Sequence, residues 1–132
     1  MMTKEEKVEH WRKLSDDDLQ VAEDLLSLKR YLYVAFMCHQ AIEKIMKAYF
    51  VKLLDDTPPF SHELPYLASR GGFFDDFSED QKNFIRQLSP LNIRTRYPEY
   101  RDMLYRQLTQ SVCQQILEQT KLLHQWISEK LL

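Results

Sequence analysis

The strongest constraint on the fold is residues 31–54, a run that contains neither proline nor glycine. Hydrophobic side chains recur at helical spacing around most of its circumference, so the run predicts one long helix. Its polar side chains form only a narrow stripe of Gln40, Glu43, Lys44 and Lys47. A helix with so little polar surface must be covered on more than one face. We therefore expect either its own bundle or a second copy of the chain to cover it.

The segment before this run predicts a first helix that reaches about residue 28. Thr3 and Glu6 have the spacing of a capping box, which marks a helix start. Ser15 precedes three aspartates and is a second cap candidate, so a restart of the helix at this point remains open. Lys29 and Arg30 suit a helix C-terminus. A tight turn after them makes the first two helices antiparallel.

The rest of the chain predicts shorter helices and one more long helix. Pro58 and Pro59 end the second helix because proline cannot donate to a helical ladder. Ser61 is expected to cap a third helix, which Gly71 and Gly72 close. Ser78 and Gln81 open a fourth helix at about 79–88. An irregular stretch with Pro90 and Pro98 follows, and a last helix spans about 109–131. The sequence therefore predicts an all-α, up-and-down bundle of four to five helices, in a single domain over residues 1–132.

Composition excludes several classes of protein. The chain has 18 Lys and Arg against 20 Asp and Glu, a net charge of -2, so a broad basic face for DNA is not expected. The two cysteines, Cys38 and Cys113, fall in predicted helices and indicate reduced, buried thiols in a cytoplasmic protein. The charged N-terminus argues against a secretory signal, and no apolar run is long enough for a membrane span. Cys38 and His39 point about 100° apart on a helix, so neither a metal site nor a cofactor is expected.

Motifs along the chain together resemble one family. The residues that carry the resemblance are Trp11, Ser15, Asp18, Leu19 and Ala22 in the first helix, Gln40, Ala41, Glu43, Lys44, Lys47 and Ala48 in the second, His62 and Leu64 after the proline loop, and Arg96, Tyr97 and Pro98. In this order and at these separations they resemble the HEPN domain, a small helical module of higher eukaryotes and prokaryotes. The resemblance covers nearly the whole chain.

The resemblance implies a two-fold homodimer, since that is the usual assembly of this family. Many bacterial members are encoded beside a minimal nucleotidyltransferase and pair with it, often as toxin and antitoxin. Active members are metal-independent ribonucleases with an arginine, four to six further residues, and a histidine. No arginine of this chain precedes a histidine by that interval. We therefore expect a non-catalytic binding or interaction module, with a metal-independent RNA endonuclease of divergent active site as the alternative.

The stretch between residues 86 and 106 combines arginines with tyrosines. Its arginines are Arg86, Arg94, Arg96, Arg101 and Arg106, its tyrosines are Tyr97, Tyr100 and Tyr105, and its only acidic residues are Glu99 and Asp102. Arginine suits phosphate oxygens and tyrosine suits base stacking, so a nucleotide or RNA could bind here. Alternatively, Arg94 and Arg96 tie the loop to the bundle by bonding helix-end carbonyls, Asp18 or Glu43.

These observations predict a ligand-binding cleft between the second helix and this loop. Its expected residues are Gln40, Lys44 and Lys47 from the helix, with Asn92, Arg94, Arg96 and Tyr97 from the loop. Asp18 lies on an apolar seam of the first helix and needs a partner, either a loop arginine or Lys44. Asp18, Glu43 and His62 are expected to form a structural polar network, and no catalytic residue is predicted.

Overall fold

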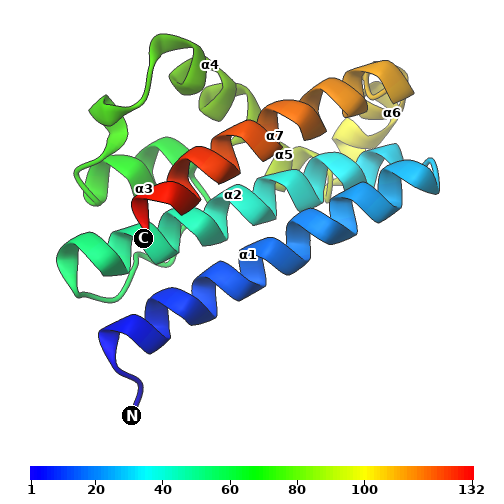
Figure 1. The fold of residues 1–132 in the computed structure, drawn as a ribbon. Coiled ribbons are helices and arrows are strands. Elements are labelled where there is room, and N and C mark those ends of the chain that lie inside the picture. Colours follow the sequence, from blue (N-terminus) through cyan, green and yellow to red (C-terminus); the bar gives the residue numbers. More distant parts are fainter.

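A computed structural model describes all residues, 1–132, and contains helices but no strand (Figure 1). The elements in chain order are α1 (Lys4–Ser27), α2 (Tyr31–Leu54), α3 (Leu64–Arg70), the 3-10 helix η1 (Phe74–Asp76), α4 (Glu79–Leu88), α5 (Leu91–Arg94), α6 (Pro98–Gln107) and α7 (Gln110–Lys130). The predicted all-α class is confirmed. No helix is both long enough and apolar enough to cross a membrane.

Helix α1 is continuous and packs along α2. The Thr3 hydroxyl accepts a hydrogen bond from the Glu6 amide at 3.1 Å, so Thr3 caps α1 as predicted, without the reciprocal bond of a capping box. A restart at Ser15 is wrong, because this residue is buried inside α1 and its hydroxyl donates to the Ala41 carbonyl at 2.5 Å. Ser15 therefore joins α1 to α2. The chain reverses at Lys29, whose φ of 62° is left-handed, and α2 runs antiparallel to α1 (Figure 1).

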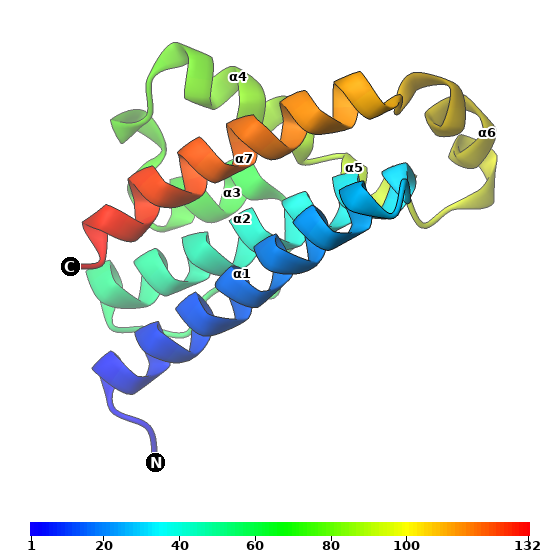
Figure 2. The same ribbon diagram turned by 45° about the vertical axis from the view of Figure 1, so that its right-hand side comes forward.

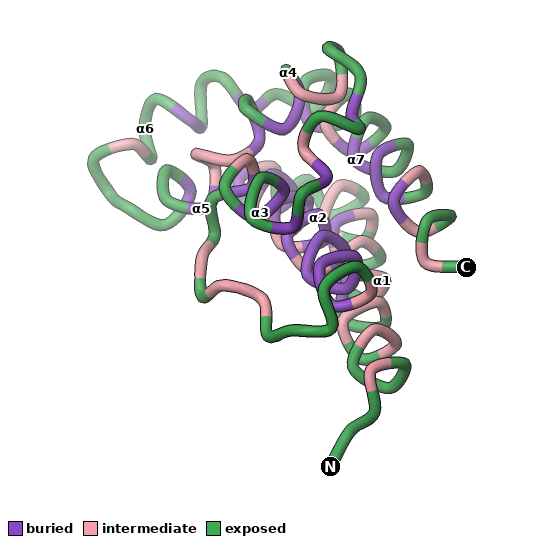
Figure 3. The backbone as a smooth tube through the Cα atoms, turned by 90° about the vertical axis from the view of Figure 1, so that its left-hand side faces the viewer, coloured by how far each residue is buried: buried purple, intermediate pink, exposed green.

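Helix α2 is the centre of the molecule, with α1, α3 and α7 packed around it (Figures 1 and 2). Its residues are buried along most of its length, as the coloured backbone shows (Figure 3). The expected coverage on more than one face is therefore present within a single chain. Of the two alternatives drawn from the sequence, the chain's own bundle covers α2, and α2 needs no second copy to bury it.

The boundaries of the shorter helices differ from the sequence expectations in two places. Ser61 does not cap α3, because its hydroxyl accepts from the Glu63 amide at 3.1 Å and Glu63 occupies the cap position. The stretch after Pro90 is not irregular but forms α5 and α6, with Pro98 in the first turn of α6. Proline has no N–H to lose in a first turn and its φ suits a helix, so these prolines start helices.

The predicted capping pair of α4 and the predicted end of α3 are both confirmed. Ser78 and Gln81 form a reciprocal capping box, with hydrogen bonds of 3.1 and 2.8 Å. Gly71 caps α3, and a Cβ at this position would lie 2.3 Å from the Phe73 ring. Gly72 follows with a φ of 79°, a conformation that glycine adopts without strain. The turn delivers Phe73 into the core, where it is fully buried.

We predict that Ile45→Ala in α2 lowers the free energy of unfolding by about 2–5 kcal/mol, because the removed side chain leaves a cavity in the buried core. Urea denaturation followed by circular dichroism measures the change. Leu53→Ala in the same helix is the matched control, since Leu53 is 46% exposed, and it should change stability by less than about 0.5 kcal/mol. Equal effects of the two substitutions would contradict the central position of α2.

Candidate functional site

Part of the predicted cleft is formed by hydrogen bonds between α2 and α5. The Asn92 amide donates to the Gln40 side-chain oxygen at 2.9 Å, which joins the two helices. Arg96 donates from Nε to the Asn92 carbonyl and from Nη2 to the Asn92 side-chain oxygen, both at 2.8 Å. Asn92 is buried and Arg96 is exposed. The structure therefore brings Gln40, Asn92 and Arg96 together, and Asn92 holds the guanidinium at the surface.

The corner between α5 and α6 presents arginine and tyrosine side chains to solvent. Arg94 is exposed and its guanidinium lies 6.0 Å from the centre of the Tyr100 ring. Tyr97 is 48% exposed. None of the arginines between residues 86 and 106 forms an ion pair with a carboxylate. The arginines of this corner therefore have no carboxylate partner.

Asp18 and Lys44 form an ion pair between α1 and α2. The Lys44 ammonium lies 2.5 Å from an Asp18 oxygen, and both side chains are largely withdrawn from solvent. Of the two partners expected for Asp18, the structure shows Lys44. Arg94 and Arg96 bond neither Asp18 nor Glu43, although Arg96 does bond a helical carbonyl. Lys44 is therefore held by a carboxylate, and a ligand would have to compete for it.

Glu43 is the centre of a second network on α2. Its carboxylate is buried and accepts from Lys47 at 3.0 Å and from His62 Nδ1 at 2.7 Å. Lys47 also lies 5.3 Å from the centre of the Trp11 ring. The buried charge of Glu43 is thus compensated on both sides. Asp18 and Lys44 form a separate pair, so the predicted polar network of Asp18, Glu43 and His62 consists of two units.

His39 lies beneath this network and supports the loop that carries His62. Its Nε2 is 2.9 Å from the His62 carbonyl oxygen and donates to it. Burial lowers the pKa of His39, although the Glu43 carboxylate and the His62 carbonyl oppose the shift. The imidazole is therefore neutral near pH 7, with its proton on Nε2.

With the helices and the polar contacts established, comparisons with known proteins identify the family. Residues 8–131 match the model of the HEPN domain. The chain belongs to the HEPN domain family. A solved structure, TT1696 from Thermus thermophilus, has a TM-score of 0.82 and 21% sequence identity, and the match covers 94% of this chain and 98% of that chain. This likeness supports the fold. A comparison with curated proteins finds no match.

In this HEPN domain, a cavity of about 330 Å³ lies beside the predicted cleft, between α3 and α5. Asn92 and His62 line it, and both were selected from the sequence. The cavity also includes residues that sequence reasoning missed, namely Glu63, Pro65, Tyr66, Ser89, Pro90 and Ile93. Only the family motif around His62 and Leu64 pointed to this region, because the approach of α3 to α5 is a tertiary contact.

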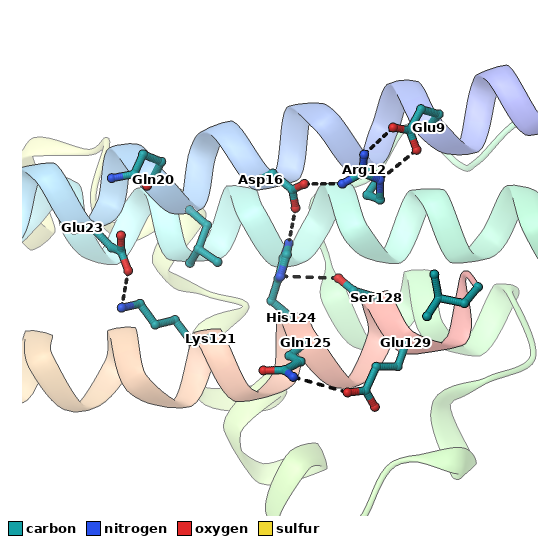
Figure 4. Close-up of a pocket in the computed structure, with 12 residues that line it drawn as sticks. Glu9, Arg12, Asp16, Gln20, Glu23, Lys121, His124, Gln125, Ser128 and Glu129 are labelled. Carbon is teal, nitrogen blue, oxygen red and sulfur yellow. Dashed lines mark hydrogen bonds and ion pairs between the residues drawn. The ribbon is translucent and has the colours of Figure 1, made fainter.

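A larger groove of about 870 Å³ lies between α1 and α7 (Figure 4). Most of its charged side chains pair with one another: Arg12 bonds Glu9 and Asp16, and Lys121 bonds Glu23. His124 lies 3.1 Å from Asp16 but forms no aligned hydrogen bond through Nε2. Acidic side chains outnumber basic ones in this groove, so it suits a phosphate ligand less well than the α5–α6 corner.

The two cysteines are buried, free thiols in the core. Burial raises the pKa of Cys38 to about 12 and that of Cys113 to about 11. Since the thiolate is the reactive form, both side chains are inert near neutral pH. No three His, Cys, Asp or Glu side chains are grouped as metal ligands would be.

We predict that stability falls as the pH decreases below about 6.5, the ordinary histidine value, because burial lowers the pKa of both His39 and His124 in the folded state. Below that pH the unfolded chain binds more protons than the folded chain. Each such histidine then contributes a loss of up to roughly 1.4 kcal/mol per pH unit. Urea denaturation between pH 7.5 and 5.5 measures the slope.

Two variants test the source of this slope. His39→Gln keeps a side-chain donor for the His62 carbonyl but does not titrate, so it should reduce the dependence of stability on pH. His10→Gln changes an exposed histidine of α1 and should leave the slope unchanged. A slope that is the same in all three proteins would show that His39 does not contribute.

Proposed function

We propose that this HEPN domain is a non-catalytic module that binds nucleotide or RNA phosphates through Arg94 and Arg96, with Tyr97 as a base-stacking surface. The observation that carries the proposal is the group of exposed arginines without carboxylate partners at the α5–α6 corner. Guanidinium groups bind phosphate oxygens through charge-assisted hydrogen bonds. A free positive corner beside an exposed tyrosine suits a phosphate-bearing ligand better than a neutral one.

The geometry of Arg96 supports this assignment. Asn92 engages Nε and Nη2, and Gln40 in turn holds the Asn92 amide. The remaining guanidinium N–H groups have no partner among the protein's hydrogen bonds and are available to a ligand. Because two hydrogen bonds to Asn92 fix its position, Arg96 loses less conformational entropy on binding than a free surface arginine.

The non-catalytic part of the proposal rests on the absence of the family's ribonuclease motif. The segment from Arg86 to Arg106 contains no histidine, and no arginine in the chain has the spacing of the family's ribonuclease motif. Arginine and tyrosine do not ordinarily exchange protons near neutral pH. The alternative function, a metal-independent RNA endonuclease, would require another acid–base group.

We further propose that the domain is the cytoplasmic partner of a minimal nucleotidyltransferase, in an arrangement of the toxin–antitoxin kind. Membership of the HEPN family supports this pairing. The buried free thiols of Cys38 and Cys113 suit a reducing compartment. The proposed partner protein and the proposed cellular compartment are independent of the proposed phosphate ligand.

The proposed assembly is a homodimer that uses the outer face of α6. Since α2 is covered within one chain, an interface must involve other apolar side chains. Tyr105 of α6 is 55% exposed, and Tyr33, in the first turn of α2, is 46% exposed. The Arg101 guanidinium bonds the Tyr105 hydroxyl at 3.2 Å. Tyrosine and arginine are enriched at the centres of protein interfaces.

We predict that a short single-stranded RNA raises the melting temperature of the protein, because a ligand that binds only the folded state stabilises it. At about 100 times Kd the stabilisation is roughly 2.7 kcal/mol, or several degrees. Arg94→Ala combined with Arg96→Ala should remove the rise without unfolding the protein, since both side chains are exposed. Differential scanning fluorimetry measures the shift.

Lys7→Ala combined with Lys13→Ala is the matched control for this experiment, because it removes the same charge from exposed positions of α1. An undiminished rise in the Arg94 and Arg96 variant would exclude the α5–α6 corner. The same RNA, incubated with the protein in a chelator, should remain intact. Cleavage that disappears in the double variant would favour the endonuclease instead.

Light scattering at micromolar concentration should give about twice the chain mass of 15.9 kDa. We predict that Tyr105→Glu reduces this mass to that of one chain, because it places a charge in the proposed α6 interface. Leu122→Glu is the control, since Leu122 is a 72% exposed residue of α7 away from α6. A wild-type monomer, or a dimer that survives Tyr105→Glu, would refute this interface.

A further inference from the structure

The cavity between α3 and α5 is connected to the arginine-bearing corner through one residue. His62 and Tyr66 line it on one side, and Ser89 and Asn92 line it on the other. Asn92 is also the residue that bonds Arg96. Asn92 therefore links the Arg96 guanidinium to this cavity.

His62 is held in one orientation by a buried carboxylate. Its Nδ1 lies 2.7 Å from Glu43, whose side chain is only 4% exposed. The hydrogen bond places the proton on Nδ1, so Nε2 is the nitrogen left for another partner. The His62 side chain is itself 56% exposed. A buried acceptor thus positions a solvent-accessible imidazole at the mouth of the cavity.

The backbone of His62 is fixed as well. His39 Nε2 donates to the His62 carbonyl at 2.9 Å, and His39 is fully buried in α2. Helix α2 therefore holds both the imidazole and the main chain of a residue that lies in a loop. Ser89 adds a second polar group to the cavity, because its oxygen accepts from the Leu64 amide at 3.0 Å and its own O–H remains free to donate.

The charges around His62 favour an anion when the imidazole is protonated. From α2, Glu43 is compensated by Lys47 at 3.0 Å, and His39 is neutral. The adjacent Glu63 is exposed and contributes one negative charge at the rim. From α5, Arg96 contributes a positive charge next to Asn92. Protonation of His62 therefore leaves the cavity with net positive charge toward Arg96.

We propose that His62 and Ser89 form a second phosphate subsite, and that His62 binds a phosphate oxygen of the ligand through Nε2 in its protonated form. The subsite rests on the proposed function, because Arg96 brings the ligand to the cavity. In this arrangement the phosphate oxygen accepts from Nε2 and Glu43 accepts from Nδ1, so each N–H of the imidazolium has an anionic partner.

Fluorescence anisotropy with a labelled RNA oligonucleotide that lacks terminal phosphates measures the contribution of the subsite to binding. His62→Gln preserves a donor for Glu43 but lacks the second ring N–H, so it should bind this probe roughly threefold more weakly than the wild-type protein. Ser89→Ala should also weaken binding, because it removes the hydroxyl donor. His10→Gln is the control, which should behave as the wild type.

Inorganic phosphate is the second probe, and it separates failure of the subsite from failure of the proposed function. The NMR signals of the His62 imidazole should shift when phosphate is added at pH 6. If RNA does not bind but phosphate shifts these signals, the proposed function fails and the subsite stands. If His62→Gln binds RNA as tightly as the wild type and phosphate leaves the His62 signals unchanged, the imidazole only anchors the loop and the inference is overturned.

Discussion

The burial of α2 along most of its length is the constraint on which the rest of the structure depends. Helices α1, α3 and α7 pack around it, and its few polar side chains therefore cannot rely on water. Each must find a protein partner, because an uncompensated charge in the interior costs several kcal/mol. Lys44 pairs with Asp18 of α1, and Glu43 pairs with both Lys47 and His62. The polar stripe of α2 thus binds α1 and the loop before α3, in addition to the packing of the apolar core.

The same requirement places the candidate site. Gln40 is the last polar residue of the stripe toward the N-terminus of α2, and Asn92 of α5 satisfies it. This contact fixes α5 against the bundle and, through Asn92, orients Arg96 toward solvent. The exposed arginines are therefore carried by a segment that the core holds in place. Binding to such a segment requires little additional ordering of the protein.

Several features were predictable because they depend on neighbours in the sequence. The long helices, the Thr3 cap and the Ser78–Gln81 box follow from periodicity and local hydrogen bonds, and the structure confirms them. The helices α5 and α6 were missed because Pro90 and Pro98 were interpreted as loop residues, whereas proline also favours a first helical turn. The cavity beside His62 had no local signal, since residues from distant segments form it.

The sequence by itself determined that the chain forms a helical bundle around a largely apolar helix, because the spacing of hydrophobic residues is a local property. It also determined which residues carry charge and which motifs resemble the HEPN family. Only the tertiary structure decided which partner each polar group takes. Lys44 rather than an arginine neutralises Asp18, and Arg94 and Arg96 remain without a carboxylate. Such choices depend on distances between helices, and these are set by packing of the whole core.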